Sequence, residues 1–519
     1  MMVRRHSFQW LWLIAVHHSG ARNLLLAVMT GGLLVLAYPK LDLWSVAFVA
    51  LVPLLVAVRG AGWRTAAKLG FATGLAFFLG SLYWVALTVV NYGGVPWVPA
   101  TGVLLLFAAY LALYIAGFGA AVAVMGQSGP KFVLSTAATW VSFELLRSHL
   151  FTGFPWLLLG HSQYQNLQLI QIAAVTGVYG ISFVLAGINA AIADALVGSG
   201  GWRARGGSLV TAGLLTGGAL AYSQMNNPQI IPPTIRVALL QGNIAQEIKW
   251  DRGFQDETVS VYRNLTLAQA RFRPDLVIWP ETAVPFFLRH DPRLSRIERL
   301  ADEIGAPLLV GAPDRDGGSP ERYTVSAFLL EPKNSISRKY DKIHLVPFGE
   351  YVPLRRLLFF VDKLTQGAIA EFVPGAEFTV FSVPAGRFAV SISYEIYFPA
   401  EVRQFVRNGA EFLVNITNDA WYGQSAAPYQ HMAMTVFRAV ENRRYLVRAA
   451  NTGISAVVAP DGRIITSSGL FERTAVTGTI APINGLTFYA RYGDVFGWGV
   501  ASGVGIAVLS VVRRYKQKR

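Results

Sequence analysis

Cysteine is absent from the 519-residue chain, and charged residues are scarce. Without cysteine, the sequence as it stands excludes disulfide bonds, thiolate metal sites and thiol catalysis. Charged residues make up 14% of the chain, whereas soluble globular proteins contain about a quarter. Hydrophobic residues make up 53%, and the mean hydropathy is +0.40. These values predict a membrane protein, and its length is too great for a single domain.

Acidic residues are also in deficit, with 30 Asp and Glu against 45 Lys and Arg, a formal net charge of +15. Such an excess can indicate a nucleic-acid partner. Here most of it lies in short loops beside apolar runs, which is typical of membrane topology. We therefore expect a lipid bilayer, and no nucleic acid, as the partner of the basic residues.

Long apolar runs are abundant, and most approach the ~20 residues that a membrane-spanning helix needs. They cover residues 22–38, 43–58, 66–90, 100–125, 131–147, 168–197, 208–223 and 494–512. With the N-terminus inside, Lys and Arg gather on the inner flanks, and the short outer loops hold only Lys40 and Arg147. The eight runs predict eight crossings. The charge bias fixes their orientation and places the tract between the last two crossings outside the cytoplasm.

Three domains follow from this topology. We expect residues 1–223 to form a membrane domain of seven helices and residues 494–519 to form an eighth helix with a basic cytoplasmic tail. Residues 224–493 form an outer domain in which strand-like runs alternate with polar, helix-permissive stretches. Runs such as Phe412–Thr417 are apolar on both faces, which suits a sheet covered on both sides. The predicted runs are Ile235–Gln241, Leu276–Pro280, Pro307–Gly311, Val325–Leu330, Phe388–Ile392, Phe412–Thr417 and Ala456–Pro460.

Ser393 stands where the strand-like run Phe388–Ile392 passes into a possible helix before Pro399. A side chain at such a turn is exposed, and the N–H groups of the helix start can stabilise an oxyanion beside it. The turn therefore suits a nucleophile. Taken alone, a serine that caps a helix is the simpler interpretation.

Two further polar groups end apolar or aromatic stretches. Glu281 follows a strand-like run, where desolvation would raise its pKa and suit it to proton transfer. Lys342 lies in a polar stretch in which a solvated lysine is the ordinary interpretation, but Glu350 can return to pair with it. Glu395 follows Ser393 by two residues.

The three motifs together resemble the signatures of the nitrilase or carbon–nitrogen hydrolase superfamily. They are Trp279-Pro-Glu281, Tyr340-Asp-Lys342 followed by His344-Leu-Val-Pro-Phe-Gly-Glu350, and Ser393-Tyr-Glu395. Combined with eight membrane helices, this arrangement is similar to the apolipoprotein N-acyltransferase family. Further matching stretches are Gln241-Gly-Asn243 through Trp250, Asn418 to Gly423 and Asn451-Thr-Gly453. The resemblance covers essentially the whole chain.

The resemblance implies an αββα sandwich for the outer domain and a role for each motif residue. Glu281 would be the general base, Lys342 would support the oxyanion, and residue 393 would be the nucleophile. Glu350, Tyr394 and Glu395 would support them. By the same match Trp250 and Trp421 would line the substrate cavity, with plain aromatic packing as an equal alternative.

The resemblance also implies a reaction. A phospholipid, typically phosphatidylethanolamine, would give its sn-1 acyl chain to the enzyme as a thioester, and the N-terminal amine of a diacylglyceryl apolipoprotein would then take it. No cofactor or metal is implied, and nothing in the sequence resembles a phosphate loop or a metal-ligand cluster. We expect a monomer in a bacterial inner membrane with a periplasmic catalytic domain.

One departure from the family pattern matters most, because Ser393 stands where the family has its catalytic cysteine. A serine hydroxyl is a far poorer acid than a thiol, so the nucleophile would be lost while the fold and substrate binding survive. A Cys→Ser replacement would also leave such a chain with no cysteine. We therefore expect an inactivated form of the enzyme.

Two other functions remain open from the residues alone. The same triad serves a membrane-anchored amidase that uses water as the second nucleophile, and Ser393 also permits a non-catalytic lipid or lipoprotein receptor. In addition, the apolar stretch 354–364 with basic flanks is either a core helix or an arm in the lipid interface that gates the site.

Overall fold

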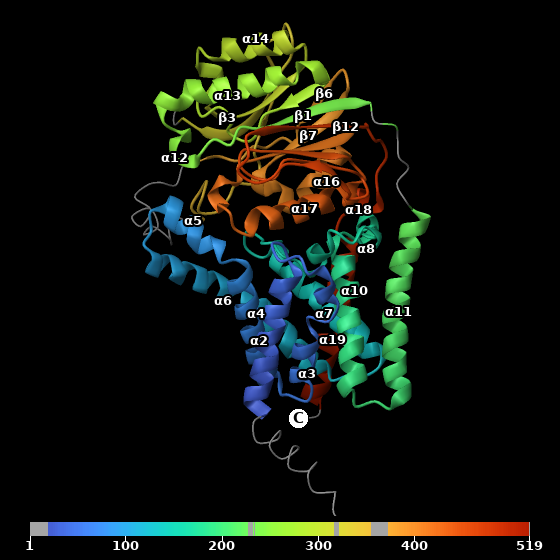
Figure 1. Ribbon diagram of the computed structural model, residues 1–519. Coiled ribbons are helices and arrows are strands. Elements are labelled where there is room, and N and C mark those ends of the chain that lie inside the picture. Colours follow the sequence, from blue (N-terminus) through green and yellow to red (C-terminus); the bar gives the residue numbers. More distant parts are fainter. Residues whose placement is uncertain (1–18, 227–231, 233, 316–320, 354–371, 518–519) are drawn as a thin grey trace, which may run out of the picture.

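The computed structural model describes residues 19–226, 232, 234–315, 321–353 and 372–517 (Figure 1). A helical bundle forms one end of the molecule and an α/β domain covers the other end (Figure 1). The predicted cytoplasmic start and the predicted arm at 354–364 lie outside the described residues.

Helices account for all eight predicted apolar segments. The bundle comprises α2 (Ser19–Ala37), η1 (Trp44–Phe48), α3 (Val52–Val58), α4 (Trp63–Ser81), α5 (Trp84–Gly93), α6 (Trp97–Met125), α7 (Pro130–His149), η2 (Leu159–Gln163), α8 (Leu167–Ile170), α9 (Ala173–Thr176), α10 (Val178–Val197), α11 (Trp202–Met225), α18 (Phe488–Tyr492) and α19 (Val495–Gln517). The segment predicted at 168–197 is not one helix, because Gly177 adopts a φ of +63° between α9 and α10. Likewise, α4 and α5 meet at a 51° bend inside the segment predicted at 66–90.

Fewer helices than eight meet the length and hydropathy expected of a membrane span. Among the described residues, α2, α6 and α10 do so, and α4 with α5 makes a fourth if the bent pair is one span. The helical region is thus compatible with a membrane protein. The count of eight crossings stays a prediction.

Two six-stranded mixed sheets form the α/β domain. The first has the order β12-β1-β2-β3-β4-β5 and the second β11-β10-β9-β8-β7-β6. Their central strands, β1-β2-β3 and β7-β8-β9, are parallel, and antiparallel strands flank them. The bounds are β1 Ile235–Gln241, β2 Leu276–Ile278, β3 Leu308–Arg315, β4 Tyr323–Leu330, β5 Ile336–Asp341, β6 Val380–Val383, β7 Gly386–Ile392, β8 Phe412–Thr417, β9 Leu446–Ala450, β10 Ala456–Val458, β11 Ile464–Ser467 and β12 Thr474–Ile480.

The sheets are stacked between two helical layers, as the αββα expectation requires. Helices α13 (Gln255–Ala268) and α14 (Leu294–Ile304) cover the far side of the first sheet, and α16 (Pro399–Arg407) and α17 (Ala427–Asn442) lie between the second sheet and the bundle (Figure 1). Successive residues of β1 alternate between the two cores, with Leu239 in the core between the sheets and Leu240 in the core under α13 and α14. Both faces of β1 are therefore buried, which explains its continuous apolar run.

One buried amide makes four of the hydrogen bonds between the domain and the bundle. The Oε1 atom of Gln430 on α17 accepts hydrogen bonds from the indoles of Trp84 (3.2 Å) and Trp156 (2.8 Å). Its Nε2 donates to the carbonyls of Pro39 (3.3 Å) and Ser81 (3.1 Å). All the hydrogen-bonding capacity of this side chain is used across the junction, so it fixes the height and the rotation of the domain on the helices.

Candidate active site

Ser393 occupies a strained turn between β7 and the short 3₁₀ helix η6 (Ser393–Tyr397). Its φ is +51°, in the left-handed region that non-glycine residues rarely adopt. Such strain costs about 1–3 kcal/mol and persists only where the surroundings enforce it. The N–H of Tyr394 is at the start of η6, where helix geometry supplies no acceptor. The turn thus presents a half-buried hydroxyl beside the Tyr394 N–H, whereas the sequence predicted an exposed side chain.

Glu395 holds this turn in place from within the protein. One carboxylate oxygen accepts hydrogen bonds from the Tyr340 hydroxyl (2.7 Å) and the Ile343 N–H (2.6 Å), and the other accepts from the Ile392 N–H (2.6 Å). The buried carboxylate therefore ties the end of β7 to the loop that follows β5. Burial raises the pKa of Glu395 to about 7.

Glu281 follows β2 and is 7% exposed. Its Oε2 accepts a 2.8 Å hydrogen bond from the Asn418 N–H. Gly311 on β3 lets the Glu281 backbone approach, because a Cβ there would lie 2.8 Å from the Glu281 Cα. Burial raises the pKa of Glu281, and the positive charge of Lys342 opposes that rise. A carboxyl with a raised pKa suits proton transfer near neutral pH.

Lys342, directly after β5, is buried, so the solvated lysine expected from its local sequence is wrong. Its Nζ donates a 2.6 Å hydrogen bond to Glu350 and lies 3.6 Å from Glu281 Oε1. Glu350 is held in turn by the Val346 N–H at 2.8 Å. Burial disfavours the charged amine, but Glu350 and Glu281 outweigh it and raise the pKa of Lys342. The ammonium is therefore kept charged and aimed at Glu281.

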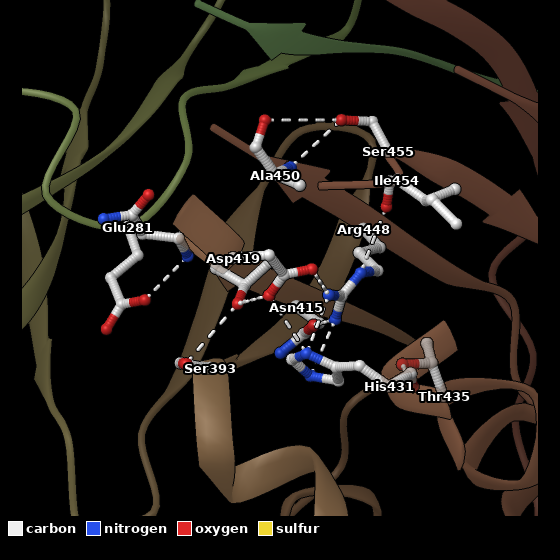
Figure 2. Close-up of polar contacts among 12 residues, drawn as sticks. Glu281, Ser393, Asn415, Asp419, His431, Thr435, Arg448, Ala450, Ile454 and Ser455 are labelled. Atoms are coloured by element: carbon white, nitrogen blue, oxygen red, sulfur yellow. Dashed lines mark hydrogen bonds and ion pairs between the residues drawn. The ribbon is translucent and has the colours of Figure 1, made fainter. Parts of the chain in front are cut away.

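The carboxyl end of β8 brings the three motifs together. The hydroxyls of Thr417 and Ser393 are 3.4 Å apart, and the next residue, Asn418, donates to Glu281 (Figure 2). Glu281 in turn meets Lys342. Three residues predicted from separate motifs thus lie around one strand end, which is where parallel sheets commonly place their functional groups.

Lys249, which the sequence analysis did not single out, lies beside Glu281. It ends the short helix α12 (Gln246–Lys249), is 1% exposed, and donates a 3.3 Å hydrogen bond to the Glu281 carbonyl. Burial lowers the pKa of Lys249 to about 8, against the attraction of Glu281. It stands in a stretch that matches the family, but nothing in its immediate sequence signals burial.

A second polar group, also missed, surrounds Asp419 close to Ser393 (Figure 2). The two oxygens of Asp419 meet the Thr417 hydroxyl (3.0 Å) and His431 Nδ1 (3.1 Å) on one side and the Arg448 guanidinium (2.7 Å) on the other. Burial opposes the charge of Asp419, but Arg448 and His431 outweigh it and lower its pKa. Burial and Arg448 together lower the pKa of His431 to about 4. The signal that could have found this group is the arginine within the apolar run Leu446–Ala450.

The two tryptophans expected in a substrate cavity lie at the edge of the domain. Trp250 follows Lys249 and is 49% exposed. Trp421, in η7 (Asp419–Tyr422), is 40% exposed, and its ring meets that of Tyr92 on α5 edge-on at 5.0 Å. Among the described residues, no group of three or more His, Asp or Glu side chains could hold a metal ion.

Comparisons with known proteins agree across both parts of the chain. The profile of the apolipoprotein N-acyltransferase N-terminal domain matches residues 30–191, and that of carbon-nitrogen hydrolases matches residues 236–483. Apolipoprotein N-acyltransferase of Geobacter metallireducens is 43% identical and covers 95% of this chain and 96% of its own length. The protein of the same name from Methylococcus capsulatus is 36% identical and covers 93% and 95%.

Among solved structures, Nit3 of Saccharomyces cerevisiae, from branch 10 of the nitrilase superfamily, is similar with a TM-score of 0.38. It is 19% identical and covers 49% of this chain and 92% of its own. The full-length relatives and the two matching profiles decide the assignment. The chain belongs to the apolipoprotein N-acyltransferase family.

Proposed function

We propose that this protein transfers an acyl chain from a phospholipid to the N-terminal amine of the diacylglyceryl-cysteine of apolipoproteins. Family membership over nearly the whole chain supports this reaction. The observation that carries it is the linked group Ser393, Glu281 and Lys342 at the end of β8, directly above an apolar helical bundle. A lipid substrate requires that combination, whereas a water-soluble amide does not.

In the proposed reaction, a cysteine at position 393 gives its proton to Glu281 and its sulfur attacks the sn-1 ester carbonyl of phosphatidylethanolamine. Lys342 and the Tyr394 N–H stabilise the tetrahedral oxyanion. The C–O bond breaks, the proton held by Glu281 passes to the leaving alkoxide, and a lysophospholipid departs from the thioester. The lipoprotein amine then attacks the thioester carbonyl and gives a proton to Glu281. The C–S bond breaks as the amide forms, and the proton passes from Glu281 to the sulfur, which regenerates the thiol.

The remaining site residues have supporting roles in this proposal. Glu350 holds Lys342 in position and Glu395 holds the turn at Ser393, because each pairs with groups on the loop after β5. Trp250 and Trp421 contact the substrate at the edge of the domain. Trp250 directly follows Lys249, which donates to the Glu281 carbonyl. Trp421 lies in η7, which begins directly after Asn418, whose N–H donates to Glu281 Oε2.

The chain as written is proposed to be inactive. A thiol has a pKa near ~8.5 and is readily ionised by a neighbouring carboxylate, whereas a serine hydroxyl is not. The turn, the oxyanion donors and the buried base would all remain. We therefore expect Ser393 to leave a folded protein that binds substrates without forming the acyl-enzyme.

We further propose the full topology that the sequence indicates. Residues 1–223 cross a bacterial inner membrane seven times, residues 224–493 form a periplasmic domain, and residues 494–519 form an eighth span that returns the chain to the cytoplasm. The protein is a monomer.

Single cysteines can test this topology, because the chain itself contains none. Ser295→Cys gives one exposed thiol on the domain, and Thr65→Cys gives one on the predicted inner loop. A membrane-impermeant maleimide applied to intact spheroplasts should label only the first. Labelling of Thr65→Cys alone would reverse the topology.

The fate of the acyl chain tests the function itself. With Ser393→Cys, phospholipid and a diacylglyceryl peptide, we expect N-acylated peptide as the product. Free fatty acid in place of acylated peptide would favour a membrane-anchored amidase-like hydrolase. Binding of both substrates with no turnover in the Cys form would instead indicate a non-catalytic receptor.

A further inference from the structure

A hollow of about 450 Å³ lies where residues of α7, α16, α18 and α19 meet. It is lined by His149, Arg403, Tyr492, Asp494, Trp498 and Ser502, together with three small or aliphatic residues. None of the candidate catalytic groups lines it. It lies at the junction of the bundle and the domain, and it contains groups of both charges.

Arg403 supplies the positive charge and has unused hydrogen-bonding capacity. Its Nη1 donates to the carbonyls of Ala490 (3.1 Å) and Arg491 (3.4 Å). Its Nε is buried without an acceptor, and among the described residues no acidic side chain forms an ion pair with it, although the charge of Arg403 acts on the nearby Asp494 carboxyl. A Cβ at Gly493 would lie 2.9 Å from this Nε, so the glycine leaves room for the guanidinium. A planar guanidinium without an acidic partner suits a phosphate group.

Asp494, His149 and Trp498 supply the opposite character on the other wall. Asp494 is 9% exposed, and its Oδ1 accepts a hydrogen bond from the Tyr489 hydroxyl at 2.9 Å. His149 Nδ1 lies 2.9 Å from the Leu145 carbonyl. The His149 ring lies 5.2 Å from that of Trp498, whose indole is 49% exposed. A carboxylate and an aromatic face together suit an ammonium group.

The surroundings of the hollow favour a lipid over a soluble ligand. Tyr492 and Trp498 are about half exposed, and Ile506 and Leu509 continue the exposed apolar face of α19. Amphipathic aromatics above an apolar helix face are typical of the membrane–water interface. Acyl chains can therefore run along α19 while the head group enters the hollow.

We infer that this hollow binds the head group of a zwitterionic phospholipid, with its phosphate on Arg403 and its ammonium between Asp494 and Trp498. The bound lipid is an accessory lipid and not the reacting donor. Arg403 lies on α16, and this helix begins two residues after the end of η6, the short helix that starts at Ser393. The lipid therefore anchors α16, the helix that follows the turn at Ser393, to the membrane surface.

Gly499→Leu tests the site with little risk to the fold. Gly499 lines the hollow, and a Cβ there would meet no atom within 4 Å, so a leucine fills the space without displacing Arg403. Gly503→Leu is the matched control, because it is equally unobstructed and lies one turn further along α19, outside the hollow. Native mass spectrometry of the full chain in detergent, titrated with phosphatidylethanolamine, counts the lipids that each variant retains.

We expect Gly499→Leu to lose one tightly retained lipid and Gly503→Leu to keep it. Phosphatidylglycerol has the phosphate but no amine, so it should be retained about tenfold less, as the loss of one charge-assisted contact implies. Asp494→Asn should reduce that preference. Equal lipid occupancy in the two leucine variants, or equal retention of the two head groups, would overturn the inference. The readout uses the Ser393 chain and measures binding, so failure of the proposed acyl transfer would not affect it.

Discussion

Two polar groups meet near Ser393, and they are built differently. On one side, Glu281 Oε2 is held by the Asn418 N–H, while Oε1 has only Lys342 at 3.6 Å among the described residues. On the other side, both oxygens of Asp419 are paired with Thr417, His431 and Arg448 at 2.7–3.1 Å. Glu281 therefore keeps one oxygen available to accept a proton, whereas both oxygens of Asp419 are already paired.

This difference supports the proposal that Glu281 reacts and that Asp419 holds the scaffold. Burial raises the pKa of Glu281, whereas Arg448 and His431 hold that of Asp419 low despite burial. A base that works near neutral pH needs the former environment. A permanently ionised carboxylate within a closed hydrogen-bond network instead fixes the backbone of β8, on which both Thr417 and Asn418 depend.

The largest expected effect comes from the reactive group. In a chain that carries Ser393→Cys, Glu281→Gln should slow thioester formation by about 10²- to 10⁴-fold, the range for loss of a general base. Glu247→Gln is the control, because this neighbouring carboxylate is exposed. Single-turnover acylation by a phospholipid measures both. Equal acylation rates in the two variants would remove Glu281 from the chemistry.

A change in the group around Asp419 should lower the stability of the folded protein. Arg448→Met leaves Asp419 as an uncompensated buried charge, which typically costs about 3–5 kcal/mol. Arg463→Met breaks the exposed pair with Asp461, 3.7 Å apart, and should cost at most about 1 kcal/mol. Thermal unfolding in detergent compares the two. If both variants melt alike, Arg448 does not hold the scaffold.

A smaller effect concerns pH. The pKa of Glu281 is raised, and Lys249 is among the positive groups that restrain the rise. Acylation of the Ser393→Cys form should therefore increase with pH through a midpoint above 4.5, the ordinary value for Glu. Lys249→Met should move the midpoint higher because it removes a stabilising charge. A midpoint that stays in place or moves down would exclude electrostatic control of Glu281 by Lys249.

Much of the fold was predictable, because burial on both faces makes strands such as β1 and β8 continuous apolar runs. Both strands have the predicted bounds. Strands β5, β6, β9, β11 and β12 were not predicted. Among them, β5 and β9 carry charged residues, Lys339 and Arg448, whose partners come from other parts of the chain. The bend between α4 and α5 and the break at Gly177 were missed for a similar reason, because local hydropathy does not record packing against neighbouring helices.

The site was predictable to the extent that short motifs end at strand termini. Glu281, Lys342 and Ser393 were predicted in this way, and Glu395 and Glu350 by their spacing; the structure brings them close together, and their roles stay a prediction. Lys249 and Asp419 were not found, because a lysine after an ordinary helical turn and an aspartate in a loop give no local signal of burial. Their environment is created only when β8, α12 and β9 come together.

The most direct test of the account is the intact mass of this chain and of its Ser393→Cys form after incubation with phospholipid. We predict an added acyl mass on the Cys form alone, removed by hydroxylamine or by a diacylglyceryl peptide. That result would establish an acyl-enzyme at residue 393 and explain why the serine chain is silent. An unmodified Cys form, folded and supplied with donor, would contradict the proposed chemistry.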